Sequence, residues 1–257
     1  MACAFSVEAE GAISEQEIYS QFREANELFD QGNIGEGAEA EKLYSEAILK
    51  FEKIINEGEI KNAGLYYNLA NAYLLKGDIG RAIVNYRKSE KLDDSNPDIK
   101  KNLAFARSRR VDQVQVKTEK KVLQTLFFWH YDFPIKVRFF LACLFFAILC
   151  LGLTAIIWLG KRTPLPAVCV VCGILMLAFT GSVSVENSVS SRVNSGVIVA
   201  ESVLPRQGDG HNYPPSFKDP LHSGTEFDLI KTQSGWHHIR LSDGSDGWIE
   251  QSAAELI

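Results

Sequence analysis

The sequence predicts a multidomain protein with a helical-repeat solenoid, a two-helix transmembrane hairpin and a small all-β barrel. Three observations carry this prediction. Residues 63–96 have the pattern of one complete helix–turn–helix unit, residues 139–160 and 165–185 are uncharged apolar runs, and from Ser195 onward apolar and polar residues alternate. Each pattern is typical of a different kind of structure, so the 257 residues hold more than one domain.

The unit at 63–96 has 34 residues, AGLYYNLANAYLLKGDIGRAIVNYRKSEKLDDSN. Its two predicted helices are separated by Gly77-Asp78, and each has one face of apolar and small residues: Tyr66, Leu69, Ala70 and Tyr73, then Ala82, Tyr86 and Ser89. The pattern resembles the tetratricopeptide repeat at nearly every signature position. The exception is Asp94, which stands where the final Pro of the repeat is expected.

Flanking segments extend this unit into a predicted tetratricopeptide-repeat solenoid over residues 10–121. A less regular repeat is predicted at about 18–58, with a link lengthened by an insertion at 33–42. Downstream, the pattern restarts at Pro97 and predicts a capping helix over 97–121. Such a solenoid is near the minimum size, because each unit buries its apolar face only against its neighbours.

The repeat resemblance implies a concave peptide-binding face. The residues that fall at its binding positions are Asn26, Asn68, Asn71, Lys101 and Asn102. An Asn side chain both donates and accepts hydrogen bonds, so it suits an extended peptide main chain, and a nearby Lys attracts a terminal carboxylate. The alternative is that Asn at these positions simply suits the repeat.

The charge distribution argues against nucleic acid as the main partner. The net charge is −5, whereas phosphate binding requires a strongly positive field. Residues 1–99 carry 10 Lys and Arg against 19 Asp and Glu, and residues 100–121 carry 8 against 2. The basic stretch is interpreted as a solvated helix face, with contact to anionic lipid headgroups as the alternative.

Residues 139–160 and 165–185 are each long enough to cross a bilayer core of about 30 Å. The four residues between them force an antiparallel hairpin, so both flanking domains lie on one side of the bilayer. Residues 122–138 form a predicted interfacial segment in which Trp129, Tyr131, Lys136 and Arg138 suit the membrane boundary.

Two further expectations concern this interfacial segment. His130 is assigned to the aromatic belt and not to a ligand set, and Pro134 is expected to separate an interfacial helix from the first span.

The side of the membrane is not decided by charge, because basic residues flank both ends of the hairpin. At the N-terminus, Val7-Glu8-Ala9 resembles an A-x-A signal-cleavage site. An ordinary N-terminal tail on a soluble repeat domain is the alternative.

The last part, residues 195–257, predicts short strands at 196–200, 226–230, 236–241 and 247–249. It resembles the bacterial SH3-like fold, a small, partly open barrel, at Gly224, at Trp236 and at the Asp243-Gly244…Gly247-Trp248 hairpin. Trp236 and Trp248 are interpreted as core residues, with an aromatic groove for a peptide or cell-wall material as the alternative.

The chain shows no predicted catalytic site, cofactor or metal site. Four of its five cysteines lie inside the spans, namely Cys143, Cys150, Cys169 and Cys172. Cys169 and Cys172 have C-x-x-C spacing, but an apolar span lacks the accessible, acidified thiol of a redox motif. Packing between helices explains these residues better than a thiol pair or a metal, although membrane thiol redox chemistry remains a further hypothesis.

The order of repeats, hairpin and SH3-like barrel resembles the repeat-containing, BatE-like members of the bacterial Bat aerotolerance-operon proteins. The resemblance implies a two-pass protein of the bacterial inner membrane whose soluble domains face the periplasm. It also implies von Willebrand A-domain membrane proteins and a MoxR-type ATPase as partners. The leading hypothesis is a non-enzymatic, membrane-anchored scaffold. The alternative is an envelope sensor whose SH3-like domain binds peptidoglycan or a peptide.

Overall fold

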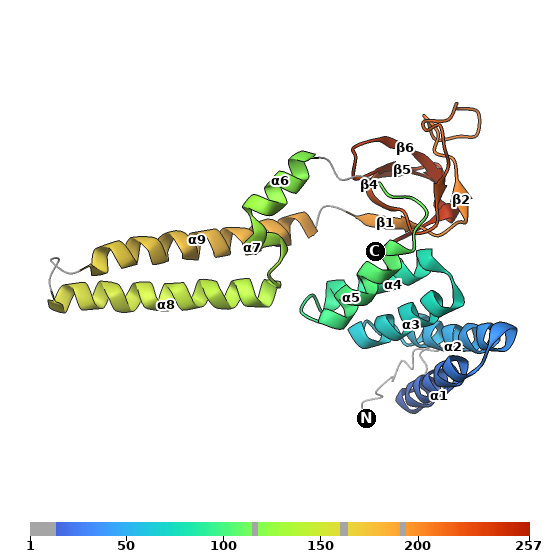
Figure 1. The fold of residues 1–257 in the computed structure, drawn as a ribbon, viewed down its shortest axis with the longest axis horizontal. Helices are drawn as coiled ribbons and strands as arrows, with labels where there is room; N and C mark the ends of the chain where they lie inside the picture. Colours follow the sequence, from blue (N-terminus) through green and yellow to red (C-terminus); the bar gives the residue numbers. More distant parts are fainter. Residues whose placement is uncertain (1–13, 115–117, 160–163, 191–193) are drawn as a thin grey trace, which may run out of the picture.

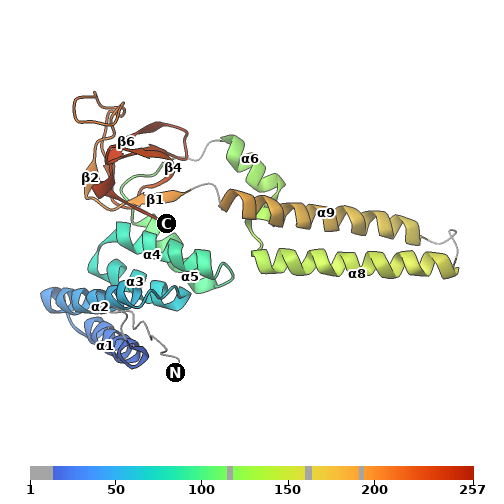
Figure 2. The ribbon, with the colours of Figure 1, turned by 180° about the vertical axis from the view of Figure 1, so that it is seen from behind.

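A computed structural model describes residues 14–114, 118–159, 164–190 and 194–257, and it is mostly helical with a small antiparallel sheet (Figure 1). Five helices stack side by side, the sheet packs on the fourth of them, and a long helical hairpin projects from this body. The view from behind shows that the hairpin joins the body at one end (Figure 2). The cleavage-like site at 7–9 and the hairpin link at 161–163 lie outside the described residues.

The stacked helices are α1 (Glu15–Ile34), α2 (Gly37–Glu57), α3 (Ala63–Lys76), α4 (Ile79–Leu92) and α5 (Pro97–Ser108). Each packs against the next in chain order. Four of them begin after a residue whose side chain accepts a backbone N–H of the first turn: Ser14, Asn62, Asp78 and Asn96. Gly77 ends α3 in the left-handed conformation, at φ 92°, which favours glycine.

The prediction that residues 33–42 form a lengthened link between the first two helices is wrong. Only Gly35 and Glu36 separate α1 from α2, and the additional residues instead extend both helices to 20 and 21 residues. The helices α3 and α4 have 14 residues each. Gly37, at φ 58°, starts α2 directly after the turn, and from Ala40 onward the helix has an apolar stripe that packs on α1 and α3.

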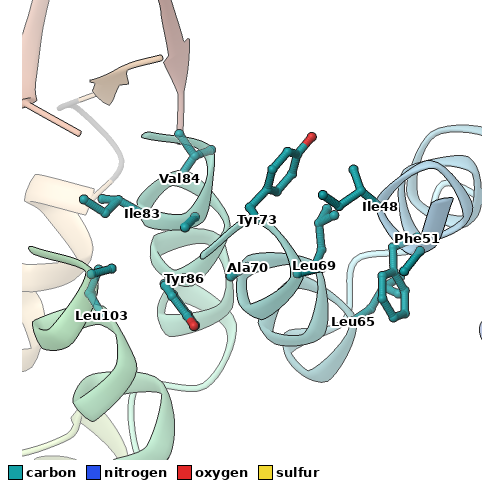
Figure 3. Packing of buried hydrophobic residues seen from close by; sticks show 14 of the residues in the cluster. Ile48, Phe51, Leu65, Leu69, Ala70, Tyr73, Ile83, Val84, Tyr86 and Leu103 are labelled. Carbon is teal, nitrogen blue, oxygen red and sulfur yellow. The ribbon is translucent and has the colours of Figure 1, made fainter. Parts of the chain in front are cut away.

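Most of the residues that the repeat pattern marks lie in the core of the stacked helices (Figure 3). Tyr66 is the exception, since it is only half-buried. Ala70 and Ala82 are fully buried where α3 and α4 approach each other, and the larger side chains of Leu69, Tyr73 and Tyr86 fill the layers on either side. Small residues at the crossing let the helices approach closely, so one apolar core runs continuously from α1 to α5.

The sheet has the strand order β6-β5-β4-β1-β7, with all pairs antiparallel. Its strands are β1 (Ser195–Ile198), β4 (Glu226–Gln233), β5 (Trp236–Arg240), β6 (Asp246–Glu250) and β7 (Ala254–Leu256). A separate pair, β2 (Ser202–Val203) with β3 (Leu221–His222), lies beside it. Ser234 and Gly235, both at positive φ, form the two-residue β4–β5 turn. The edge strands β6 and β7 are not paired with each other among the described residues.

The sheet and the helices form one packed body. Val197 of β1 belongs to the buried cluster of the helices. A Cβ on Gly80 of α4 would lie 2.8 Å from the carbonyl oxygen of Ile198, so this close approach requires a residue without a side chain. Arg81 Nε of α4 lies 3.2 Å from Glu255 Oε1 of β7.

The predicted capping helix over 97–121 is too long. The helix α5 ends at Ser108, and the chain then runs to the sheet, where Asp112 accepts hydrogen bonds from His222 N and Thr225 Oγ1 at 2.6 and 2.7 Å. Arg107 and Arg110 of the basic stretch pair with Glu226 of β4. Both interpretations of this stretch, solvated face and lipid contact, are therefore wrong for these two arginines.

The hairpin consists of α8 (Ile135–Leu159) and α9 (Leu165–Ser190), which pack along their described length. Both are long and apolar enough to cross a membrane by length and composition, over Ile135–Trp158 and Leu165–Glu186. The first span begins four residues before the predicted 139–160 and the second ends one residue after the predicted 165–185, so they include Arg138 and Glu186. Residue 160 lies outside the described residues. The two charges pair across the hairpin, so neither one ends its helix.

Two short helices precede the hairpin, α6 (Thr118–Leu126) and α7 (Phe128–Tyr131). They lie at the end of the hairpin that is nearest the body (Figures 1 and 2). Pro134 separates α7 from α8, as predicted. The predicted interfacial segment 122–138 therefore covers most of α6, all of α7 and the first turn of α8.

Candidate functional site

The asparagine face, defined by Asn26, Asn68, Asn71 and Asn102, is formed by the three alternate helices α1, α3 and α5. All four side chains are half-buried. The first pair joins α1 to α3, because Asn68 Nδ2 donates to Asn26 Oδ1 over 3.2 Å. Asn26 Nδ2 donates in turn to the carbonyl oxygen of Phe22, at 2.8 Å, which orients the amide.

The second pair joins α3 to α5. Asn102 Nδ2 donates to Asn71 Oδ1 at 3.2 Å and to the hydroxyl of Tyr67 at 2.8 Å. Asn71 Oδ1 also accepts from the hydroxyl of Tyr86, which is fully buried below it on α4. Burial raises the pKa of the Tyr86 phenol, so the hydroxyl remains protonated and keeps donating at any physiological pH.

The internal bonds leave specific amide groups available. In the described part of the chain, no hydrogen bond uses Asn68 Oδ1, Asn71 Nδ2 or Asn102 Oδ1. The available groups are therefore one donor, Asn71 Nδ2, and two acceptors, Asn68 Oδ1 on the same helix and Asn102 Oδ1 on α5. An extended peptide main chain presents C=O and N–H groups in alternation, so it matches this arrangement.

Apolar side chains flank the asparagine face. Leu75 is four residues after Asn71 on α3, Phe105 is three residues after Asn102 on α5, and both spacings place the pair on one helix face. Leu75 is 51% exposed and Phe105 is 52% exposed. A bound peptide could therefore bury apolar side chains beside its hydrogen-bonded backbone.

Lys101 is not part of the asparagine network. Its side chain is exposed, and no ion pair joins it to another described residue. It is adjacent to Asn102 in sequence, but consecutive residues on a helix point about 100° apart. The structure thus brings the four asparagines together and leaves Lys101 at the rim.

The tryptophans of the sheet are covered. Trp236 and Trp248 are each 8% exposed. The His238 ring stacks on Trp248 with 4.8 Å between centroids, and Lys231 Nζ lies 4.8 Å from the same ring centroid. His211, from the loop at 204–221, contacts Trp236 edge-on. These contacts favour the core interpretation over an open aromatic groove.

The cysteine pattern gives no site in the structure. Among the described residues, no group of three His, Cys, Asp or Glu side chains could hold a metal ion. Cys169 and Cys172 are buried between α8 and α9, and a Cβ on Gly152 would lie 2.6 Å from Cys169 Sγ. The sulfur therefore fills the space that glycine leaves, which is the packing role expected of it.

Two features of the site were missed by sequence reasoning. The phenols of Tyr67 and Tyr86 orient the second asparagine pair, and Tyr86 was assigned to the core alone. Arg138 was predicted only as a residue that suits the membrane boundary, whereas it is 2% exposed and pairs with Glu186 across the hairpin. A single Glu directly after an apolar run was the available signal for that pair.

Comparison of the chain with protein-family models gives no match, and comparison with curated proteins finds no relative.

Proposed function

We propose that this protein is a non-enzymatic, membrane-anchored scaffold that holds an extended segment of a partner protein on its asparagine face. The observation that carries the proposal is the set of unused amide groups, Asn68 Oδ1, Asn71 Nδ2 and Asn102 Oδ1, on a face flanked by exposed apolar side chains. Recognition through main-chain groups gives affinity, and the flanking apolar residues give specificity.

In this proposal α1–α5 are a short tetratricopeptide-repeat solenoid and residues 195–257 are an SH3-like module. The stacked hairpins with small residues at their crossings support the first assignment. The twisted antiparallel strands with glycine turns support the second. Because Val197 of β1 belongs to the buried cluster of the helices, the two parts are packed against each other and are not two tethered modules.

The proposal places α8 and α9 across a bilayer, with the body on one side. The apolar surface of the hairpin supports this placement, since most side chains in its two candidate spans are exposed in the isolated chain. By resemblance, the membrane is the bacterial inner membrane and the body faces the periplasm. Von Willebrand A-domain membrane proteins and a MoxR-type ATPase system would then be the candidate partners.

A photo-crosslinking experiment tests the asparagine face in the full chain in its own membrane. A photoreactive amino acid replaces Leu75, and the crosslinked protein is identified by mass spectrometry. The second variant combines the same label with Asn71→Asp. Aspartate keeps the oxygen that accepts from Tyr86 and Asn102, and it replaces the Nδ2 donor with an acceptor.

We expect one crosslinked partner at position 75, reduced at least fivefold by Asn71→Asp at unchanged thermal stability. Leu49 of α2, which is 66% exposed and lies outside the asparagine face, is the control position for the label. Equal capture from positions 49 and 75, or capture unaffected by Asn71→Asp, would reject this role of the asparagine face.

The alternative function is an envelope sensor that binds peptidoglycan through the SH3-like module. The burial of Trp236 and Trp248 weighs against an open aromatic groove for glycan. Co-sedimentation of the full chain in detergent with purified cell wall tests this function directly, and pelleting that survives removal of the partner protein would favour it.

A further inference from the structure

A polar cluster around the buried Arg138 lies at the body end of the hairpin, where an apolar helix pair would normally have none. Arg138 Nη2 donates to Glu186 Oε2, and Nη1 donates to Ser182 Oγ over 2.9 Å. Arg138 Nη1 also lies 3.0 Å from His130 Nδ1, and Ser182 Oγ lies 2.7 Å from the same nitrogen. Arg138, His130, Ser182 and Glu186 thus join α7, α8 and α9 through one network.

This network favours one tautomer of His130. Arginine has only donors, so its contact with Nδ1 is a hydrogen bond when Nδ1 carries no proton, whereas a proton on Nδ1 would face the Nη1–H group across 3.0 Å. The favoured tautomer therefore carries its proton on Nε2. No hydrogen bond in the described part of the chain uses the Nε2–H of His130, so this donor is available to a bound molecule.

A cavity of about 320 Å³ lies beside His130, between the short helices and α9. Rings of Phe127, Trp129 and Tyr131 form part of its wall, together with Ala178 and Ser182 of α9. The walls are apolar apart from the imidazole, the serine hydroxyl and the polar edges of Trp129 and Tyr131. Such a cavity suits a molecule with an apolar body and one hydrogen-bond acceptor.

The position of the cavity indicates what this molecule is. Ser182 and Val185 line it, and the candidate span of α9 ends at Glu186, the next residue. In an inserted hairpin, this is the depth at which the hydrocarbon core meets the headgroups, where aromatic belts lie and where lipid ester carbonyls are found. An ester carbonyl accepts hydrogen bonds, and its acyl chain supplies the apolar body.

We propose that this cavity binds the ester region of a membrane phospholipid, with His130 Nε2–H donating to an ester carbonyl oxygen. The acyl chain lies among Phe127, Trp129 and Ala178, and the Arg138–Glu186 pair favours the donating tautomer of the imidazole. The inference rests on the membrane insertion proposed above.

Native mass spectrometry of the full chain in detergent tests the proposal with two defined probes. One is an ester-linked phosphatidylglycerol, and the other is the ether-linked analogue with the same headgroup and chains but without carbonyls. We expect the chain to retain the ester lipid about fivefold better, the difference that one net hydrogen bond makes. Equal retention of the two lipids would overturn the proposal, as would preferential retention of an added prenylquinone.

Two variants sharpen this test. His130→Phe removes the donor and keeps a ring, so the ester preference should be lost. Ala178→Leu reduces the cavity and should lower retention of both lipids, whereas Ala147→Leu on the exposed face of α8 should change neither. An ester preference that survives His130→Phe would reject the assigned donor. Carbonate extraction of membranes separates the outcomes: a chain that is extracted contradicts the anchor itself, and a retained chain without ester preference contradicts only this inference.

Discussion

The backbone N–H of Ile135 donates to Oδ2 of Asp94 over 2.8 Å. This bond joins the first residue of α8 to the turn between α4 and α5, at the position where the repeat pattern expects proline. Lys136 Nζ and Asp93 Oδ1 lie 3.9 Å apart beside it. The departure from the repeat pattern therefore has a structural role, because a carboxylate caps the first helix of the hairpin and attaches it to the body.

Replacing Asp94 tests this attachment. Asp94→Ala removes the acceptor and should destabilise the start of α8 by about 1 kcal/mol, the usual cost of losing a cap. Hydrogen exchange of the amides at 135–138 should become faster, while the core amides of α3 and α4 keep their protection. Asp94→Asn retains an acceptor oxygen and should stay close to wild type. If the amides at 135–138 exchanged at the same rate in Asp94→Ala as in the wild type, the Asp94 carboxylate would not be what holds the start of the hairpin.

The ion cluster between α5 and the sheet gives a second prediction. Glu226 of β4 lies 2.6 Å from Arg107 and 3.1 Å from Arg110, and Arg87 of α4 is within 3.7 Å. Glu226→Ala leaves these arginines without their shared partner, so we expect the free energy of unfolding to fall by about 3 kcal/mol. Urea denaturation of the full chain in detergent, followed by tryptophan fluorescence, measures the change.

The exposed Glu201 supplies the matched control for this variant. Glu201→Ala should change the free energy of unfolding by less than about 0.5 kcal/mol. Similar losses in the two variants would mean that the arginine cluster has no special part in joining the helices to the sheet.

The same cluster makes the free energy of unfolding depend on pH in the acidic range. Burial opposes ionisation of Glu226, but its hydrogen bonds with Arg107 and the nearby positive charges outweigh burial and lower its pKa. Burial likewise opposes ionisation of Asp112, and the hydrogen bonds from Thr225 and His222 lower its pKa. Both carboxyl groups have lower pKa values in the folded chain than in the unfolded chain. Their contribution to the free energy of unfolding is therefore complete above the unfolded-state pKa values, and it is lost as the pH falls through the folded-state pKa values.

We therefore expect the midpoint of thermal unfolding to fall as the pH drops below about 4.5, the ordinary pKa of Glu226. Glu226→Gln cannot titrate at this position, so the acid-dependent part of the loss should be smaller in that variant. Identical pH profiles of the wild type and Glu226→Gln would contradict the assignment.

Two glycines of the hairpin allow the same substitution to be compared in a crowded and in an open environment. A Cβ on Gly152 would lie 2.6 Å from Cys169 Sγ, whereas a Cβ on Gly173 would have no heavy atom within 4 Å. Alanine favours a helix over glycine by about 1 kcal/mol, so Gly173→Ala should stabilise the hairpin. Gly152→Ala must displace the sulfur, so it should be neutral or destabilising. Thermal unfolding in detergent distinguishes them, and equal stabilisation would argue against the close packing at Gly152.

The helix positions were predictable because local signals specify them. Asn62, Gly77, Asp78 and Asn96 act through bonds to residues within one turn, so the sequence neighbourhood carries the information. The lengths of α1 and α2 were not predicted, since the glycines at 35 and 37 were included in a longer insertion. The apolar stripe of each of these two helices continues almost to the turn. In the sequence, however, this helical periodicity is a weaker signal than the two glycines, which indicate a loop.

The contacts between distant segments were not predictable in the same way. Arg107 and Glu226 are 119 residues apart, and only the folded chain brings them together. Hydropathy likewise started the first span after Arg138 and ended the second before Glu186, because it scores each charge alone and a paired charge costs less. The asparagine positions followed from the repeat resemblance, whereas the pairing of their amides depends on side-chain rotamers.

The most direct test of the membrane-anchored scaffold is the sidedness of its two soluble parts. The native cysteines are replaced by serine, and single cysteines are placed at Glu57 in the helices or at Glu201 beside the sheet, both exposed. The full chain in sealed membrane vesicles is then treated with a membrane-impermeant maleimide before and after detergent. A hairpin anchor predicts the same result at both positions, either labelling before detergent or protection until detergent is added. Labelling of one position with protection of the other would contradict it.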